Sequence, residues 1–192
     1  MTDVLPVIRV EPIFASRRQP RRAWAPALAC VVGLVGASLL WVAHSHRGLV
    51  LANETPSEPP GLYVRVVRDP IRVGTIIAFM APSAAFPYAD RKAAYLHKTP
   101  ILKAVAAIAG DRVCTLGGVL AVNGVRLAPI RQHDSQGFAL PHWTACRRLV
   151  PGEVFVFSDR VPNSFDSRYY GPVNVASALV YRPLITTSGI GR

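Results

Sequence analysis

The sequence predicts a mostly β fold for a chain of 192 residues, with a single N-terminal transmembrane helix in front of the β domain. Two observations carry this prediction. One uncharged apolar run covers residues 24–43, and the chain after it consists of short segments rich in Val, Ile and Tyr, separated by Gly, Pro, Asn or Asp. Such segments between turn residues indicate strands, and about 150 residues suffice for one hydrophobic core.

The apolar run is long enough for a membrane span, because twenty helical residues at about 1.5 Å each cover the roughly 30 Å hydrocarbon layer. Four arginines between residues 17 and 22 precede it, whereas only Arg47 follows closely. The positive-inside rule therefore places the N-terminus in the cytoplasm and the following domain in the periplasm. A cleaved secretory signal is the alternative, with a weak site at Ala43-His44-Ser45; the run is longer than such a signal needs, so we favour an anchor.

Four parts follow from this interpretation. We expect a basic cytoplasmic tail over residues 1–23, the transmembrane anchor over 24–43, a linker over 44–60, and an exported β-rich domain over 61–192. The prolines of the linker exclude a regular helix there.

The β domain is expected to contain seven strands. The predicted strands are Leu62–Arg68, Thr75–Met80, Ile101–Ile108, Val113–Leu116, Val119–Val122, Val154–Ser158 and Ala178–Arg182. Asn123-Gly124 between two apolar segments is a strong hairpin signal. Residues 84–97 are expected to form a short helix or an insertion, and residues 129–143 a loop.

The net charge of +11 is compatible with nucleic-acid binding. The basic residues are scattered, however, and several belong to the topology signal. No Lys/Arg cluster interleaved with aromatic residues occurs in the β domain, so we expect lipid headgroups of the inner membrane, and no nucleic acid, as the partner of this charge.

The three cysteines divide between the predicted membrane span and the exported domain. Cys30 lies in the apolar run, while Cys114 and Cys146 fall in the exported part, where an oxidising compartment favours a disulfide. Two free buried thiols are the alternative. No further ligands at suitable spacing accompany them, so no metal site is predicted.

Ser57 is the first candidate for a chemical role, since its segment begins at Thr55, a dozen residues after the apolar run, and would be tethered at the membrane surface. A serine hydroxyl is a poor nucleophile without a neighbouring base. The usual base is His, but His97, His133 and His142 lie in predicted loops without an obvious orienting Asp, and we interpret them as surface residues. The sequence contains no G-x-S-x-G, S-x-x-K or H-E-x-x-H motif.

Lys103 is the best candidate for the base. Strand alternation places it on one face with Ile101, Val105 and Ala107, where an ammonium is costly. Burial would favour the neutral amine near neutral pH, which is the form that accepts a proton. Exposed lysines at strand edges are common, so this pattern alone is modest support.

A third segment, Ser158–Pro172, combines small hydroxyls, carboxylates and arginines between two predicted strands. This density indicates a rigid hydrogen-bonded loop. An ordinary polar loop is the alternative, and without the other two segments it would be preferred.

Three motifs in this order resemble the boxes of type I signal peptidases. They are Asn53-x-Thr55-x-Ser57-x-Pro59-x-Gly61-Leu62-Tyr63, Leu102-Lys103-x-Val105-x-x-Ile108-x-Gly110-Asp111-x-Val113 and Ser164-x-Asp166-Ser167-Arg168-Tyr169-x-Gly171. The endings of the first and last boxes are most similar to the TraF-type conjugative-transfer signal peptidases. The resemblance covers about residues 53–184 and implies a signal-peptidase/LexA-like β catalytic domain.

The resemblance also implies roles for single residues. Ser57 would be the nucleophile and Lys103 the general base, while Thr55 and the Ser57 backbone N–H would form the oxyanion hole. Ser164 would orient the lysine amine. Asp166 and Arg168 would form an ion pair that supports the site.

The function implied is a membrane-anchored serine endopeptidase with a Ser/Lys dyad and without a cofactor. Its substrate would be a membrane-inserted precursor, such as a conjugative pilin subunit, which it would cleave or cyclise. Two alternatives stay open: a general signal peptidase for secreted preproteins, and a non-catalytic envelope scaffold of a conjugation or secretion complex.

Overall fold

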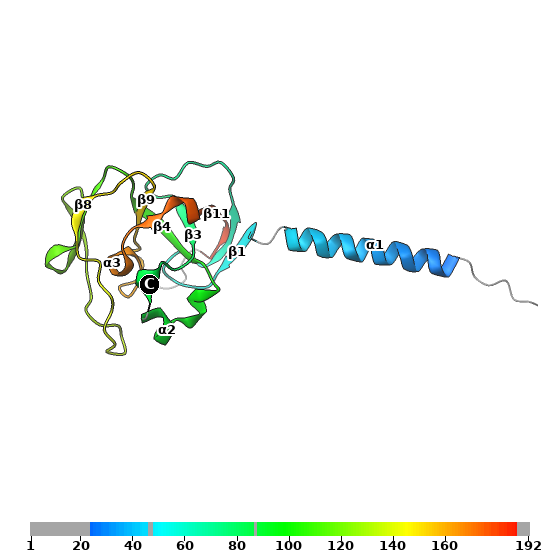
Figure 1. Cartoon of the computed structure of the whole chain (residues 1–192), viewed down its shortest axis with the longest axis horizontal. Coiled ribbons are helices and arrows are strands. Elements are labelled where there is room, and N and C mark those ends of the chain that lie inside the picture. Colours follow the sequence, from blue (N-terminus) through cyan, green and yellow to red (C-terminus); the bar gives the residue numbers. More distant parts are fainter. Residues whose placement is uncertain (1–23, 46–47, 87, 188–192) are drawn as a thin grey trace, which may run out of the picture. The chain divides into compact units, whose positions relative to one another are not determined.

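The structure, a computed structural model, describes residues 24–45, 48–86 and 88–187, with the backbone alone at 24, 25, 27 and 39–45 (Figure 1). The predicted cytoplasmic tail over residues 1–23 lies outside these residues. The chain divides into two compact units at His46 and Arg47, and each is described by itself.

The first unit contains one helix, α1 (Trp24–Ser45), drawn in blue in Figure 1. It covers the predicted apolar run and ends two residues later. Pro26 is tolerated because the N–H groups of the first helical turn have no partner within the helix. Among the described residues no helix is long and apolar enough to cross a membrane. The predicted span stays a prediction.

The second unit is mostly β, as predicted, and its larger sheet has seven strands. Their order is β1 (Val50–Asn53), β2 (Gly61–Arg65), β11 (Leu179–Thr186), β3 (Ile76–Phe79), β4 (Ile101–Ala107), β9 (Glu153–Val156) and β10 (Val173–Asn174). Every neighbouring pair is antiparallel. Strand β4 is therefore a central strand, with β3 and β9 as neighbours.

A second sheet has four strands in the order β7 (Val125–Pro129), β6 (Val119–Val122), β5 (Arg112–Cys114) and β8 (Cys146–Arg148). The hairpin between β6 and β7 turns at Asn123 and Gly124, which have φ values of 51° and 86°. Two positive φ values in succession are the geometry that an Asn-Gly turn favours. The predicted hairpin is confirmed.

Short helices fill the connections. The 3₁₀ helices are η1 (Ser83–Ala85), η2 (Ala94–His97), η3 (Leu116–Gly118) and η4 (Val175–Ser177), and the α-helices are α2 (Tyr88–Lys92) and α3 (Ser167–Tyr170). The segment 84–97 thus folds into short helical turns, and residues 130–145 form a loop with one isolated bridge between His133 and Ala139.

The main hydrophobic core lies against the larger sheet. It includes Ile77, Phe79, Ile101, Val105 and Val156, all nearly inaccessible to solvent. At about 25 cal/mol per Å² of apolar area, such side chains contribute roughly 1.5–3 kcal/mol each, which fixes the position of the central strands. The strand that carries Lys103 is therefore rigidly held.

The predicted linker over residues 44–60 differs from the structure. Its second part contains β1, which pairs with β2 in the register Val50↔Val64 and Asn53↔Gly61. A four-residue strand beside a proline-rich loop is too short to show an alternation in the sequence. Strand β1 and the loop that carries Ser57 accordingly belong to the same compact unit as the two sheets.

Gly61 joins the loop that carries Ser57 to strand β2, and only glycine fits there. Its φ is +150°, and a Cβ atom at this position would collide with the backbone carbonyl of Ile185 on β11. This close approach fixes where the loop ends relative to the sheet.

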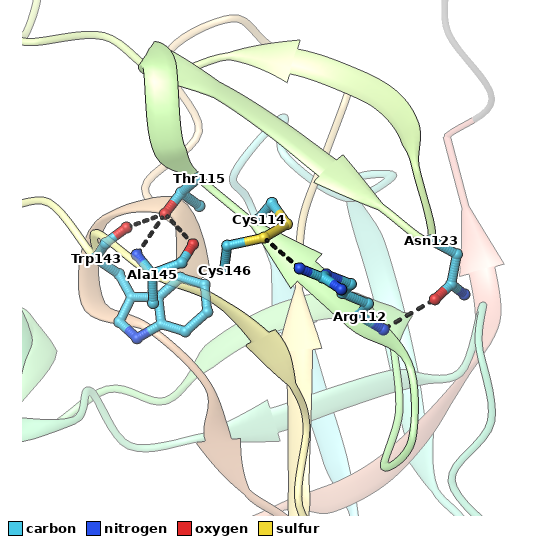
Figure 2. The surroundings of a disulfide bond; sticks show 7 residues. All are labelled: Arg112, Cys114, Thr115, Asn123, Trp143, Ala145 and Cys146. Atoms are coloured by element: carbon cyan, nitrogen blue, oxygen red, sulfur yellow. Dashed lines mark hydrogen bonds between the residues drawn. A yellow bond between two sulfur atoms is a disulfide. The ribbon is translucent and has the colours of Figure 1, made fainter.

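Cys114 and Cys146 form the predicted disulfide, and Cys30 is free and exposed. The two half-cystines are register partners on β5 and β8 (Figure 2). Nearby, the Thr115 hydroxyl donates to the carbonyl of Trp143, and the Ala145 N–H donates to the Thr115 hydroxyl at 3.2 Å. The disulfide and the Thr115 bonds thereby tie the C-terminal end of the loop of residues 130–145 to the smaller sheet.

We predict that replacing Cys114 and Cys146 together by alanine lowers the free energy of unfolding by about 3–4 kcal/mol, since the bond closes a loop of 32 residues. Urea unfolding of the oxidised protein measures this, with Cys30→Ser as the matched control that should leave stability unchanged. Equal urea midpoints for all three proteins would contradict the prediction.

Candidate active site

The loop between β1 and β2 carries Ser57, and Asn53 at the end of β1 organises it. The Asn53 amide nitrogen donates to the carbonyls of Thr55, Glu58 and Pro59 at 2.9, 3.0 and 3.2 Å. Its amide oxygen accepts from the backbone N–H of Thr55 at 3.2 Å. One buried side chain thus replaces the backbone ladder that the prolines of this loop prevent.

Ser57 and Lys103, which lie 46 positions apart in the sequence, are in direct contact. Lys103 Nζ and Ser57 Oγ are hydrogen-bonded, and the two residues are only 5% and 6% exposed. Lys103 comes from β4, opposite Ile77 on β3. The structure brings together the two residues that the sequence selects as nucleophile and base.

Burial lowers the pKa of Lys103 and is the largest influence on it. The negative charges of Asp166 and Glu58 raise this pKa, and the positive charge of Arg168 lowers it. Desolvation disfavours the ammonium form, so the neutral amine is more accessible than in a free lysine. In that form the amine accepts the hydrogen bond from the serine hydroxyl.

Thr55, expected in an oxyanion hole, lies beside the nucleophile. Its hydroxyl oxygen is 3.4 Å from Ser57 Oγ and donates to Asn53 Oδ1 at 2.7 Å. A threonine has one hydroxyl hydrogen, which is engaged by Asn53 in this structure. Donation to a second oxygen would therefore require the hydroxyl to rotate away from Asn53.

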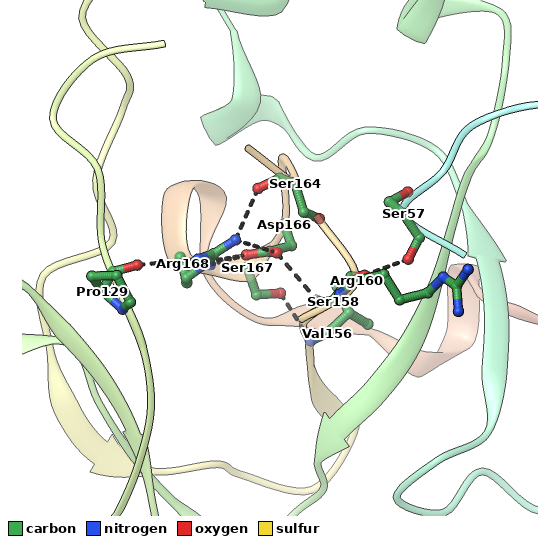
Figure 3. A network of polar contacts seen from close by, with 9 residues as sticks. All are labelled: Ser57, Pro129, Val156, Ser158, Arg160, Ser164, Asp166, Ser167 and Arg168. Atoms are coloured by element: carbon green, nitrogen blue, oxygen red, sulfur yellow. Dashed lines mark hydrogen bonds and ion pairs between the residues drawn. The ribbon is translucent and has the colours of Figure 1, made fainter. Parts of the chain in front are cut away.

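Ser158 and Arg160, which follow the end of strand β9, also hold the nucleophile loop in place (Figure 3). The Ser158 hydroxyl donates to the Ser57 carbonyl, and Arg160 Nε donates to the Pro56 carbonyl at 3.3 Å. The Pro56 carbonyl belongs to the same peptide group as the Ser57 N–H. Sequence reasoning did not assign either role, because the contacts join positions about a hundred residues apart.

Asp166 and Arg168 form the expected ion pair, and it is buried. Arg168 Nε donates to Asp166 Oδ1 at 2.8 Å, and Nη2 donates to Oδ2 at 2.9 Å. Nη2 also donates to the Ser164 carbonyl at 3.0 Å, and Nη1 donates to the Pro129 carbonyl at 3.1 Å. The bidentate geometry satisfies both charges, and it connects α3 with the loop of Ser164 (Figure 3).

Ser164, expected to orient the lysine amine, lies in the same cavity wall as Ser57 and Lys103. Its hydroxyl is buried and has no hydrogen-bond partner among the described residues. The expected hydrogen bond to Lys103 is therefore not formed in this structure.

Glu58 is a buried carboxylate that the sequence analysis did not single out. It is 5% exposed, and its Oε1 accepts from the backbone N–H of Ala104 at 2.8 Å. Burial raises the pKa of Glu58, while this hydrogen bond and the charge of Lys103 lower it. A glutamate between serine and proline carries no recognisable signal in the sequence, so only the fold could reveal it.

A cavity of about 740 Å³ opens at the dyad. Its walls come from four parts of the chain: β1 with the nucleophile loop, residues 95–96 and 99–103, residues 161 and 163–165, and Tyr181 on β11. An extended peptide of a few residues fits a space of this size. His97, His133 and His142 are not among its lining residues, and His97 pairs with Asp90 at 2.5 Å.

The described residues contain no group of three His, Cys, Asp or Glu side chains arranged to hold a metal ion. The chemistry that the site supports rests on the buried amine, the hydroxyl and the backbone groups around them. This arrangement suits a nucleophilic attack by Ser57 Oγ with proton transfer to Lys103.

Comparison with known proteins gives consistent matches. The family model described as signal peptidase, peptidase S26, matches residues 21–180. A conjugal transfer protein TraF from Agrobacterium fabrum is 31% identical over 169 residues, which cover 81% of this chain and 92% of that protein. A signal peptidase I from Bacillus caldolyticus is 32% identical over 116 residues, covering 55% of this chain and 56% of that protein.

Among solved structures, a signal peptidase I from Enterococcus faecalis matches with a TM-score of 0.36 and 24% identity, over 59% of this chain and 96% of that one. This structural likeness is too weak to support an argument. The match to the family model covers most of the chain, and the chain belongs to the signal peptidase family, peptidase S26.

Proposed function

We propose that this protein is a serine endopeptidase with a Ser57/Lys103 dyad that processes an exported precursor of a conjugative transfer apparatus. The observation that carries the proposal is the hydrogen bond between a buried lysine amine and a buried serine hydroxyl, in the wall of a cavity. Membership in the signal peptidase family supports the same reaction class.

In the proposed mechanism, neutral Lys103 Nζ takes the proton of Ser57 Oγ as the oxygen attacks the carbonyl carbon of the scissile bond. The resulting Lys103 ammonium then gives its proton to the leaving amine, and an acyl-enzyme on Ser57 remains. Attack by water releases the product and frees the serine. Attack by an amine of the substrate would instead form a new peptide bond and a cyclic product.

The negative charge on the tetrahedral intermediate needs donors. We propose the backbone N–H of Ser57 and the hydroxyl of Thr55 in this role. Arg160 supports it, because its bond to the Pro56 carbonyl fixes and polarises the peptide group that carries the Ser57 N–H. Thr55 would exchange its bond to Asn53 for one to the oxyanion.

The assignment to conjugation rests on the relatives. The TraF of Agrobacterium fabrum, a conjugal transfer protein, matches 81% of this chain, whereas the Bacillus caldolyticus signal peptidase I matches 55%. This favours a dedicated precursor, such as a pilin subunit, over the general processing of secreted preproteins.

For the dyad, we predict that Ser57→Ala and Lys103→Ala each reduce processing by at least about 10³-fold, because each removes one half of a proton-transfer unit. The assay is mass spectrometry of the pilin precursor of the same transfer system after incubation with the full-length protein in membranes. Lys98→Ala, a matched change at a lysine outside the cavity lining, should stay active. Processing by Lys103→Ala at the wild-type rate would eliminate the proposed base.

The lowered pKa of Lys103 gives a prediction for pH. Because the neutral amine is the active form, the initial rate should rise with pH through a single limb and level off above it. That limb should lie below the pKa of about 10.4 of a free lysine. Rates of precursor cleavage against pH measure it. A limb near pH 6.5 that disappears on replacing His97, His133 or His142 would identify a histidine base instead.

We further propose that residues 24–43 anchor the chain in the inner membrane with the N-terminus in the cytoplasm. The uncharged run and the arginines before it support this. Full-length protein should stay in the membrane pellet after carbonate extraction, and protease added to spheroplasts should digest the domain after residue 47. Recovery of the full-length chain in the carbonate supernatant would contradict the anchor.

A further inference from the structure

Glu58 lies directly behind the dyad. It follows Ser57 in the chain, is almost completely buried, and is not among the residues that line the cavity. A substrate in the cavity therefore has no path to its carboxylate. An effect of Glu58 on the reaction thus passes through its neighbours in the nucleophile loop and on β4.

The carboxylate of Glu58 connects the two segments that carry the dyad. Its Oε1 accepts the backbone N–H of Ala104 at 2.8 Å, next to Lys103 on β4, while its own carbonyl accepts from Asn53 Nδ2 at 3.0 Å. The nucleophile loop and the base strand are thus joined at adjacent residues.

Four other charged groups surround this pair. Asp166 and Arg168 face Lys103 from the segment around α3, and Arg160 and Asp159 face Glu58 from the segment after β9. Asp166 is already neutralised by its bidentate pair with Arg168, and Asp159 and Arg160 are exposed to solvent. Glu58 is the buried carboxylate near Lys103 that no described arginine pairs with.

We propose that Glu58 is a positioning residue of the dyad, which holds strand β4 against the nucleophile loop and supplies the counter-charge for protonated Lys103. This inference rests on the proposed function and deepens it. When Lys103 takes the proton of Ser57, a positive charge forms on a side chain that is only 5% exposed. A carboxylate fixed nearby stabilises that ammonium and strengthens the amine as a base.

Glu58→Gln tests the charge separately from the position, because the amide oxygen can still accept from Ala104. The pH limb of activity should move to lower pH, since the negative charge that favours the ammonium is gone. The plateau rate should fall roughly two- to tenfold because the amine becomes a weaker base, and KM should stay unchanged. A purely structural role would lower the rate without moving the limb.

Two variants act as controls. Glu58→Asp keeps the charge, and its limb should stay close to the wild-type position even if the shorter side chain loosens the contact. Glu153→Gln removes a partly buried carboxylate that pairs with Arg147, and it should move neither limb nor plateau. Limbs that coincide in wild type and Glu58→Gln, or that move equally in Glu58→Gln and Glu58→Asp, would overturn the inference.

A measurement without activity separates this inference from the proposed function. The chain has three lysines, so ¹³Cε-lysine NMR of the full chain in micelles can follow Lys92, Lys98 and Lys103 in one titration. In Glu58→Gln the pKa of Lys103 should fall relative to the wild-type protein. If the Lys103 pKa falls in Glu58→Gln but Ser57→Ala and Lys103→Ala still process the precursor, the proposed function fails. The charge interaction between Glu58 and Lys103 is then still supported.

The reciprocal experiment covers the case in which Glu58→Gln does not fold. Coupling between two charges is mutual, so Lys103→Met should raise the pKa of Glu58 further. Carboxyl ¹³C NMR resolves this readily, since the chain has four glutamates. An unchanged Glu58 titration in Lys103→Met would refute the proposed counter-charge, whatever the state of the other variant.

Discussion

The buried contact between the Lys103 amine and the Ser57 hydroxyl is the interaction on which the rest of the site depends. An ammonium at 5% exposure is costly, so the fold must either neutralise the lysine or surround it with compensating charge. The structure does both in part: burial lowers the pKa of Lys103, and the carboxylates of Asp166 and Glu58 oppose this effect. The balance sets the pH range in which the amine accepts a proton.

This balance requires the nucleophile loop to keep its place, and three separate elements hold it. Asn53 binds the loop from β1, Ser158 and Arg160 bind its carbonyls from beyond β9, and Glu58 binds the neighbouring N–H on β4. A loop with several prolines has few backbone donors of its own, so side chains supply the bonds. Rigidity at Ser57 is the consequence, and it preorganises the attack.

Much of this could be predicted from the sequence. The Asn123-Gly124 hairpin and the Cys114–Cys146 bond follow from local turn geometry and from the predicted compartment. The apolar residues on either side of Lys103 indicate a buried lysine and hence a candidate base. The alternation of residues along β4 says less about which side chains are buried. Strand β4 is a central strand, and Leu102 and Lys103, which point to opposite faces, are both buried.

Other features could not be predicted, and the reason is tertiary. Strand β8, Cys146–Arg148, has no alternation of apolar and polar residues, and β10 has two residues. The Ser158 contact with Ser57 joins positions 101 residues apart. The Ser164 hydroxyl likewise has no hydrogen-bond partner among the described residues, which depends on the exact placement of the loop and which no sequence pattern encodes.

The central claim is that Lys103 activates Ser57 as a nucleophile, and covalent trapping tests it most directly. Full-length protein is incubated with a serine-reactive acylating probe, and the labelled residue is identified by peptide mass mapping. The account predicts one acyl group, on Ser57, and at least about 10³-fold slower labelling in Lys103→Ala. Labelling of Ser57 at the wild-type rate in Lys103→Ala, or an acyl group on another residue, would contradict it.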